Sequence, residues 1–261
     1  MFKFGKKRMY KIKEKYKANK ESIEGFISEF DNSGELFVKG NRNSIKLFKL
    51  DALTLNIKSF KKPNIINKIA YRYFRKSKAR RSFEFASKLM EMQIGTPQPV
   101  AFFENYDFVG LKESYYACEH LENVFEFREI VQNEAFENRD FIIRKFTQFT
   151  FEMHEKGIEF LDHSPGNTLI RKNNDGSYSF FLVDLNRMQF HETIDFKTRM
   201  KNLSKITHKK DMIAVMSNEY AKLSNGNETT IFETMWGLTA DFQYRFRRKK
   251  RIKKKLKFWK K

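Results

Sequence analysis

The sequence is poor in cysteine, proline and glycine, and it has no long uncharged apolar run. Its 261 residues include one Cys, four Pro and 11 Gly. The single cysteine, Cys118, cannot form an internal disulfide, which excludes a disulfide scaffold and suits a reducing compartment. No stretch approaches the roughly 18 apolar residues of a membrane-spanning helix, and no apolar run of a cleaved signal peptide follows the first charges. We therefore expect a cytoplasmic protein without a transmembrane segment.

The composition is otherwise that of a folded protein with a sizeable core. Hydrophobic residues make up 40% of the chain, and 29 of them are Phe, which excludes global disorder. A chain of this length can hold one domain or two small lobes. Cys118 lies in an apolar segment, where a small buried side chain is favoured over a redox role.

Acidic residues are scarce at the two ends of the chain. Residues 1–20 contain nine Lys/Arg and one Glu, and residues 245–261 contain twelve Lys/Arg and no acid, so the formal +20 lies in two predicted tails. Both ends interleave basic with aromatic and aliphatic residues, which favours an anionic membrane surface, contacted through residues 245–261, over nucleic acid. A solvated disordered tail is the alternative for such charge runs.

The segment 158–184 is the most informative stretch of the chain. Asp162 is followed by Asn167, two apolar runs flank Asn173-Asn174-Asp175-Gly176, and Asp184 closes the segment. An Asn/Asp-Gly turn between such runs predicts a β-hairpin, which would bring Asn167 beside Asp184. An amide oxygen and a carboxylate suit Mg²⁺, and Asp162 is placed to accept a proton from an attacking hydroxyl. Taken singly, each of these residues is more often a simple turn former.

Partners for such a site are found upstream. Residues 44–60 predict two strands broken near Asp51, the second ending at Lys58, and residues 76–94 predict a helix with Glu84 early in it. A Lys58–Glu84 ion pair would hold the ammonium towards nucleotide phosphates. Lysine is common here, and a solvated strand end is the plainer interpretation of Lys58. The intervening basic segment, residues 61–78, predicts either a short amphipathic helix that touches membrane or substrate, or one packed on the lobe.

Together these residues resemble a known family. The chain is similar, over about residues 33–220, to the bacterial lipopolysaccharide core kinases, the Kdo/heptose-kinase group of the protein-kinase-like superfamily. The resemblance lies in the order and spacing of several motifs: NIKSFKKPN, SKARRSFEFASKL, GTPQPVAFFE, the hinge-like SYYACEHLE, FLDHSPGNTLI and VDLNR.

The resemblance implies a set of site residues and cofactors. It implies ATP and Mg²⁺, with Asp162 as catalytic base and Lys58 on the phosphates. The remaining implied contacts are Glu84 as partner of Lys58, Asn167 and Asp184 on the metal, and Gly40, Glu119 and His120 on the nucleotide.

Departures from the general kinase pattern lead to further expectations. Phe160-Leu161 replaces the His-Arg before the catalytic Asp, so regulation by loop phosphorylation is not expected. Asn186 stands where Gly of Asp-Phe-Gly would, and we expect it to adopt the positive φ of the turn. His163 is placed to touch substrate. Arg187 either meets a phosphate or an anionic substrate, or faces solvent.

The expected fold is α+β, a bilobal protein-kinase-like fold with basic tails at both ends. A basic arm, residues 1–24, is expected before a β-rich N-lobe, residues 25–121, with about five strands and one key helix. A larger helical C-lobe, residues 122–243, is expected to contain helices over 141–156, 197–223 and 232–246, followed by a basic tail, residues 244–261.

The expected function is phosphorylation of a sugar hydroxyl of the lipopolysaccharide inner core, on Kdo or heptose, at the cytoplasmic membrane face. The acceptor would be a lipid-linked core oligosaccharide. A kinase of proteins or small soluble molecules, and a membrane-surface pseudokinase scaffold, are the alternatives.

Overall fold

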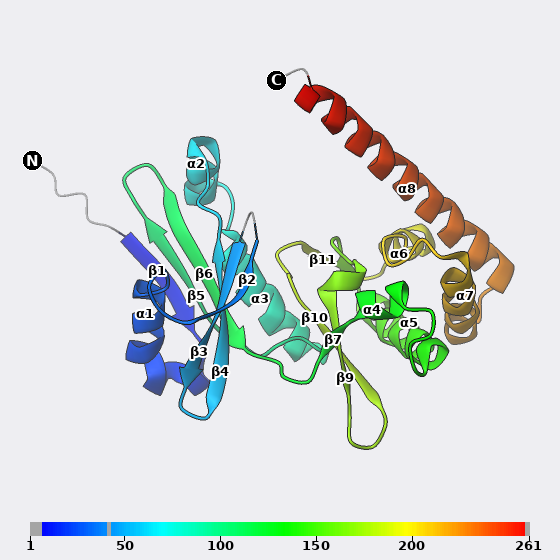
Figure 1. The fold of residues 1–261 in the computed structure, drawn as a ribbon, viewed down its shortest axis with the longest axis horizontal. Coiled ribbons are helices and arrows are strands. Elements are labelled where there is room, and N and C mark those ends of the chain that lie inside the picture. The colour runs from blue at the N-terminus through cyan, green and yellow to red at the C-terminus, as the bar shows by residue number, and fades with distance from the viewer. Residues whose placement is uncertain (1–6, 41–42, 259–261) are drawn as a thin grey trace, which may run out of the picture. The chain divides into compact units, whose positions relative to one another are not determined.

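The computed structural model describes residues 7–40 and 43–258. The chain divides into two compact units. Unit 1 holds the described part of Met1–Glu122 together with Asp184–Asn186, and unit 2 holds Asn123–Val183 and the described part of Arg187–Lys261. The expected α+β class is confirmed, because a β-sheet dominates the N-terminal region and helices the C-terminal region (Figure 1).

Unit 1 is built on a six-stranded antiparallel sheet with the order β1-β5-β6-β4-β3-β2. The two predicted strands of residues 44–60 are present as β3 and β4, which meet at a turn where Asp51 has a φ of 52°. The strands are β1 (Lys7–Ile12), β2 (Glu35–Lys39), β3 (Asn43–Leu50), β4 (Leu53–Phe60), β5 (Pro99–Tyr106) and β6 (Leu111–Glu119).

Helices lie on both faces of this sheet. Buried side chains of α1 (Lys20–Ser28) join the cluster that contains Ile57 and Phe103. On the other face, α3 (Lys78–Glu91) packs Phe83 against Phe102 of β5, with ring centroids 5.4 Å apart. Strand alternation explains this division, since successive residues of β5 point to opposite faces. The predicted helix of residues 76–94 is therefore confirmed, and Ser77 caps its first turn.

The N-terminal arm predicted for residues 1–24 is wrong for the residues that the structure describes. Lys7–Ile12 form β1, which pairs with β5 along six residues, and Glu14–Asn19 form a 3-10 helix that leads into α1. Ile12, Tyr16 and Ile23 are buried in the unit 1 core. The basic residues of this segment therefore belong to an edge strand and a packed helix and not to a free tail. The expectations for residues 1–6 lie outside the described residues.

The basic segment 61–78 forms a short helix, α2 (Ile65–Tyr73), before α3 begins. It contains no buried residue. The amphipathic helix predicted for this segment is thus present, and its apolar side faces away from the unit.

Unit 2 is mostly helical. It carries a three-stranded sheet with the order β10-β9-β7 and a two-stranded sheet, β11-β8. The strands are β7 (Phe125–Glu126), β8 (Ile158–Phe160), β9 (Thr168–Lys172), β10 (Tyr178–Leu182) and β11 (Met188–Phe190). The helices are α4 (Phe127–Gln132), α5 (Arg139–Glu155), α6 (Phe196–Leu203), α7 (Lys210–Ser224) and α8 (Glu228–Phe258), with a 3-10 turn at Pro165–Asn167.

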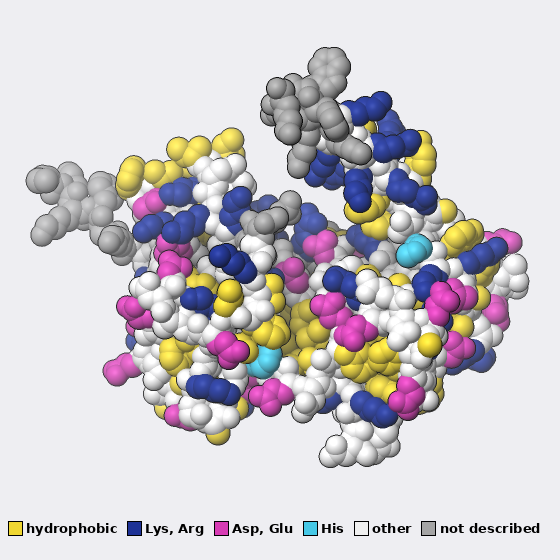
Figure 2. Space-filling model, in the orientation of Figure 1, with side chains coloured by type: hydrophobic (Ala, Val, Ile, Leu, Met, Phe, Trp, Pro, Cys, Tyr) yellow, Lys and Arg dark blue, Asp and Glu magenta, His cyan; other side chains and the backbone are white. Residues whose placement is uncertain are grey.

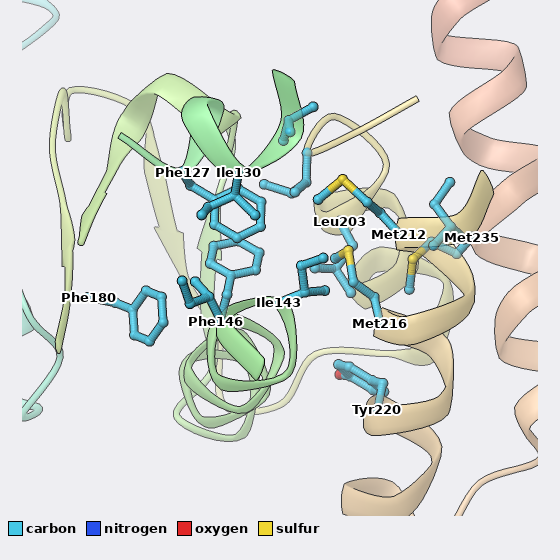
Figure 3. Close-up of a cluster of buried hydrophobic side chains, with 14 of the residues drawn as sticks. Phe127, Ile130, Ile143, Phe146, Phe180, Leu203, Met212, Met216, Tyr220 and Met235 are labelled. Atoms are coloured by element: carbon cyan, nitrogen blue, oxygen red, sulfur yellow. The ribbon is translucent and has the colours of Figure 1, made fainter. Parts of the chain in front are cut away.

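The unit 2 core gathers apolar side chains from α4, α5, α6, α7 and α8 (Figure 3). Phe127 and Phe146 stack at its centre, with ring centroids 4.0 Å apart. Both are fully buried, as are Met212 and Met216. The prediction that the phenylalanines of residues 141–156 belong to the core holds for Phe146, whereas Phe141 is 47% exposed.

The predicted hairpin is confirmed. β9 and β10 pair from Thr168 opposite Leu182 to Lys172 opposite Tyr178. The turn closes through a hydrogen bond from the Gly176 amide to the Asn173 carbonyl, and Gly176 has the positive φ, 81°, that favours glycine there. At the base of the hairpin, the Val183 amide donates to the Asn167 carbonyl at 3.0 Å.

The C-terminal basic segment was predicted to be a tail, but its described residues belong to a helix. α8 continues through residue 258, well past the end predicted at residue 246. Lys and Arg side chains gather over the later part of this helix (Figure 2). None of the described helices is both long enough and apolar enough to cross a membrane.

Candidate active site

Lys58 of β4 is positioned by strand register. It pairs with Tyr116 of β6, which in turn pairs with Phe102 of β5, so the three side chains share one face of the sheet. This is the face that α3 covers, because Phe102 contacts Phe83. The Lys58 side chain is only 14% exposed, so Lys58 is not the solvated strand end that the sequence also allowed.

The partner of Lys58 is Asp184, 126 residues later in the chain. Lys58 Nζ donates to Asp184 Oδ1 at 2.8 Å, and Asn186 Nδ2 donates to the same oxygen at 2.7 Å. Burial raises the pKa of the Asp184 carboxyl, but Lys58 and Asn186 outweigh it and hold the pKa below its ordinary value. Asp184 is therefore an ionised carboxylate at neutral pH.

The turn after the hairpin differs from the sequence expectation. The residue with positive φ is Asp184 itself, at 58°, and not Asn186. Asn186 instead closes the turn, because its amide donates to the Asp184 carbonyl at 2.9 Å. A left-handed conformation of a carboxylate residue at such a turn is the kind of strain that folded proteins retain at functional positions.

The predicted Lys58–Glu84 ion pair is not what the structure shows. Glu84 accepts from Lys76 Nζ at 2.7 Å and from Arg80 Nε at 2.9 Å. Burial raises the pKa of Glu84, but these two cations outweigh it and leave the pKa lowered. The reason is local: Arg80 lies one helical turn before Glu84, at the spacing where helix side chains meet.

The remaining predicted nucleotide contacts all lie in unit 1. Gly40 precedes the β2–β3 connection, and its amide donates to the Asn43 carbonyl at 3.0 Å. Glu119 ends β6, and its carboxylate accepts from Tyr16 Oη at 2.5 Å and from Lys15 Nζ at 3.1 Å. The His120 amide is bonded to the Thr54 carbonyl, and its ring meets Phe37 of β2 edge-on. The Glu119 side chain therefore anchors the 3-10 helix (Glu14–Asn19).

Cys118 is buried, as the sequence indicated. Its thiol contacts the Asn56 carbonyl, and burial raises its pKa to about 12. A thiol of that kind is not a nucleophile at neutral pH.

In unit 2, Asp162 and Asn167 belong to one loop between β8 and β9. Asn167 Nδ2 donates to the Asp162 carbonyl at 2.8 Å, which fixes the amide orientation. The Asp162 carboxylate accepts from Arg187 at 3.1 Å. Arg187 thus binds the predicted catalytic base, which neither interpretation of the sequence anticipated.

A sequence profile of the lipopolysaccharide kinase (Kdo/WaaP) family matches residues 55–226, about two thirds of the chain. The chain belongs to this family. It is therefore a phosphotransferase of a family whose activity uses a nucleotide. The family assignment predicted from the spacing of Lys58, Glu84, Asp162, Asn167 and Asp184 is confirmed.

The fold agrees with the Kdo/WaaP assignment. A solved structure described as WaaP in complex with acyl carrier protein superimposes with a TM-score of 0.64 at 14% identity, over 91% of this chain and 97% of that one. A Rio2 kinase complex with ADP, Mg²⁺ and phosphoaspartate from Chaetomium thermophilum gives 0.48 at 11% identity, over 85% and 75%. A search of curated proteins by sequence found no match.

A buried polar network around Asn202 supports the loop that carries Asp162. Asn202 of α6 donates to the Phe160 carbonyl at 2.8 Å, and its Oδ1 faces His163 Nδ1 at 3.1 Å and His154 Nε2 at 3.2 Å. Since that oxygen only accepts, both histidines donate to it, and Tyr220 then donates to His154 Nδ1 at 3.0 Å.

His163 was predicted to touch substrate, and this is wrong. Its ring is fully buried beside Phe146 and Phe160. Burial lowers the pKa of His163 to about 3 and that of His154 to about 4, so both rings are neutral. His163 therefore belongs to the buried network that holds the loop carrying Asp162.

Two basic residues beside the loop were missed by the sequence argument. Lys205 donates to the Leu161 carbonyl at 2.5 Å, and burial lowers its pKa while the nearby Asp162 charge opposes that shift. Arg128 of α4 lies against Gly166: an ideal Cβ built on Gly166 would lie 2.0 Å from the Nη2 atom of Arg128. The glycine was a visible signal, but nothing in the sequence connected it to Arg128.

Asn167 and Asp184, the two residues that the resemblance assigns to Mg²⁺, each have one side-chain oxygen to consider. Asn167 Nδ2 is bonded to the Asp162 carbonyl, so its Oδ1 is the atom left for a cation. Both donors at Asp184 converge on Oδ1, and no bond to Oδ2 is found within residues 7–40 and 43–258. Each of these atoms, taken separately, is an oxygen donor of the kind that Mg²⁺ prefers.

Proposed function

We propose that the chain is an ATP- and Mg²⁺-dependent kinase that phosphorylates a sugar hydroxyl of the lipopolysaccharide inner core, on Kdo or heptose. The lipid-linked acceptor would be met at the cytoplasmic face of the membrane. The observation that carries the proposal is the ion pair between Lys58 and Asp184 at 2.8 Å in a chain of the Kdo/WaaP family. These two types of side chain handle phosphate and metal in kinases.

Asp162 is the proposed catalytic base. Its carboxylate would accept the proton of the acceptor hydroxyl as the oxygen attacks the γ-phosphorus. The contact from Arg187 at 3.1 Å supports this role, because it holds the carboxylate in one orientation. Phosphoryl transfer needs little covalent help from the protein, so positioning and charge provide most of the acceleration.

Lys58 would contact the α- and β-phosphates, with Gly40, Glu119 and His120 near the rest of the nucleotide. Asn167 and Asp184 would hold Mg²⁺, which neutralises charge on the β- and γ-phosphate oxygens when bound. Lys58 then exchanges part of its bond to Asp184 for phosphate.

The basic end of α8 supports a peripheral membrane role. Residues 245–261 carry twelve basic residues, and Phe246 and Ile252 are exposed. Each Lys or Arg near an anionic surface contributes about 1 kcal/mol of attraction.

The test is phosphate transfer from ATP to a purified core acceptor. Asp162→Asn should lower kcat by about 10²- to 10⁴-fold, the usual contribution of a general base. Asp184→Ala should abolish transfer and the Mg²⁺ dependence of nucleotide binding, while the thermal unfolding temperature stays near that of wild type. Asp175→Asn is the matched control, because Asp175 is an exposed carboxylate in the turn of the same hairpin. An active Asp184→Ala enzyme would refute the metal assignment.

The same transfer assay distinguishes two alternative functions. A pseudokinase scaffold would bind nucleotide without any transfer to lipid-borne or soluble acceptors. A kinase of soluble molecules would lose nothing on deletion of residues 245–261, whereas transfer to a lipid-borne acceptor should fall.

A further inference from the structure

α2 displays an apolar surface that the proposed chemistry does not use. Ile66 is 74% exposed and Phe74, which follows the helix, is 85% exposed. Phe108, in the turn between β5 and β6, is 82% exposed. Figure 2 shows hydrophobic side chains gathered over the α2 end of unit 1. The surface, called here the α2 patch, comprises Ile65, Ile66, Ile69, Tyr73, Phe74 and Phe108.

The helix that carries this patch is firmly attached to unit 1. Lys68 Nζ binds Asp107 Oδ2 at 2.5 Å, and Arg72 donates to the Phe108 carbonyl at 2.5 Å. The α2 backbone lies directly against Gly110, where an ideal Cβ would come within 2.3 Å of the Lys68 carbonyl oxygen. Asn64 caps the helix by accepting from the Asn67 amide at 3.0 Å. The apolar exposure is therefore a fixed feature of the fold.

This arrangement inverts the usual pattern of a surface helix. A helix packed on a globular core buries its apolar side and exposes its polar side. Here the residues that attach the helix, Lys68 and Arg72, are its charged ones. The apolar side of α2 is left without a partner among the described residues, and apolar patches of this kind mark interaction surfaces.

The charge around the patch indicates what covers it. Residues 61–76 contain six Lys/Arg and no acid. Lys62, Lys68 and Lys76 are paired with carboxylates, whereas Lys61, Arg72 and Arg75 have no carboxylate partner within residues 7–40 and 43–258. Apolar and aromatic tips ringed by uncompensated cations suit an anionic lipid interface, where the apolar groups enter the acyl boundary and the cations stay at headgroup level.

We propose that the α2 patch inserts into the interface of an anionic lipid bilayer. It is a second attachment point, separate from residues 245–261, and it sits on the unit that carries Lys58. Because it is carried by packed secondary structure, it would set the orientation of unit 1 at the membrane.

The test is sedimentation of the full-length protein with phosphatidylcholine vesicles prepared with and without phosphatidylglycerol. Ile66→Ser combined with Phe74→Ser should weaken binding to the anionic vesicles by roughly 25-fold, since each side chain withdrawn from the interface contributes on the order of fivefold. Met90→Ser is the matched control. Met90 is an apolar residue, 41% exposed, on helix α3 of the same unit, and its replacement should leave binding unchanged.

Unchanged vesicle binding by the double variant would overturn the proposal. So would a double variant that keeps vesicle binding but loses binding to purified acyl carrier protein, because the patch would then be a protein-docking surface. Vesicle binding is measured without ATP or acceptor, so an absence of phosphoryl transfer would count against the proposed kinase activity and not against the α2 patch. In an active preparation, the double variant should retain wild-type nucleotide-dependent thermal stabilisation.

Discussion

The buried histidine pair beneath the catalytic loop predicts acid lability of unit 2. The folded pKa values of His163 and His154 are about 3 and about 4, below the ordinary 6.5. At a pH between the folded pKa and the ordinary pKa of 6.5, the unfolded chain binds more protons than the folded chain. The free energy of unfolding therefore falls as the pH drops below about 6.5. At pH 5 each histidine costs about 2 kcal/mol, from 1.36 kcal/mol per pH unit. Together they remove about 4 kcal/mol, a large part of a typical 5–15 kcal/mol stability.

The measurement is urea denaturation at several pH values, followed by Trp fluorescence, because Trp236 packs against the unit 2 core. His163→Leu removes one titrating ring and should roughly halve the loss of stability between pH 6.5 and 5. His208→Gln, at an exposed histidine, should leave the pH dependence intact. A wild-type protein equally stable at pH 7 and pH 5 would show that the network is solvated, and the neutral pair would have to be abandoned.

Two further outcomes follow from the structure. Gly157→Ala should reduce the free energy of unfolding by about 2 kcal/mol or more, because the φ of 70° disfavours a side chain and an ideal Cβ would lie 2.0 Å from the His191 carbonyl oxygen. Gly176→Ala should reduce it by only about 1 kcal/mol, because Gly176 has a φ of 81° but no atom within 4 Å of an ideal Cβ. Equal losses for the two variants in urea denaturation would contradict this reasoning. Cys118 should resist iodoacetamide at pH 8 in the native protein, because burial raises the pKa of its thiol to about 12. It should react in urea, and mass spectrometry follows the labelling in both conditions. Rapid labelling of the native protein would show that the thiol is accessible.

Local patterns in the sequence predicted local structure well. The hairpin of β9 and β10 follows from an Asn/Asp-Gly turn between apolar runs, and α3 from its apolar spacing. β1 was missed because it is a basic edge strand in which only Ile12 is buried, so its sequence carries almost no alternation. Its partner, β5, is about ninety residues away, and no local pattern reports that pairing.

The candidate site was predictable in its residues and not in its contacts. Motif order placed Lys58 and Asp184, but their ion pair joins positions 126 residues apart. The Arg80–Glu84 bond joins residues four positions apart on a predicted helix, so it could have been predicted from the sequence. It was missed because Glu84 was expected to pair with Lys58. The role of His163 depended on Asn202, a residue with no motif of its own.

The position of β1 has a practical consequence for anyone preparing this protein. Trimming the first two dozen residues as a dispensable cationic leader would strip β5 of its neighbour along six residues. It would also remove Tyr16 and Ile23 from the core. The bare backbone of β5 would then invite pairing with other chains. Expression of a stable protein therefore requires that residues 7–24 be kept.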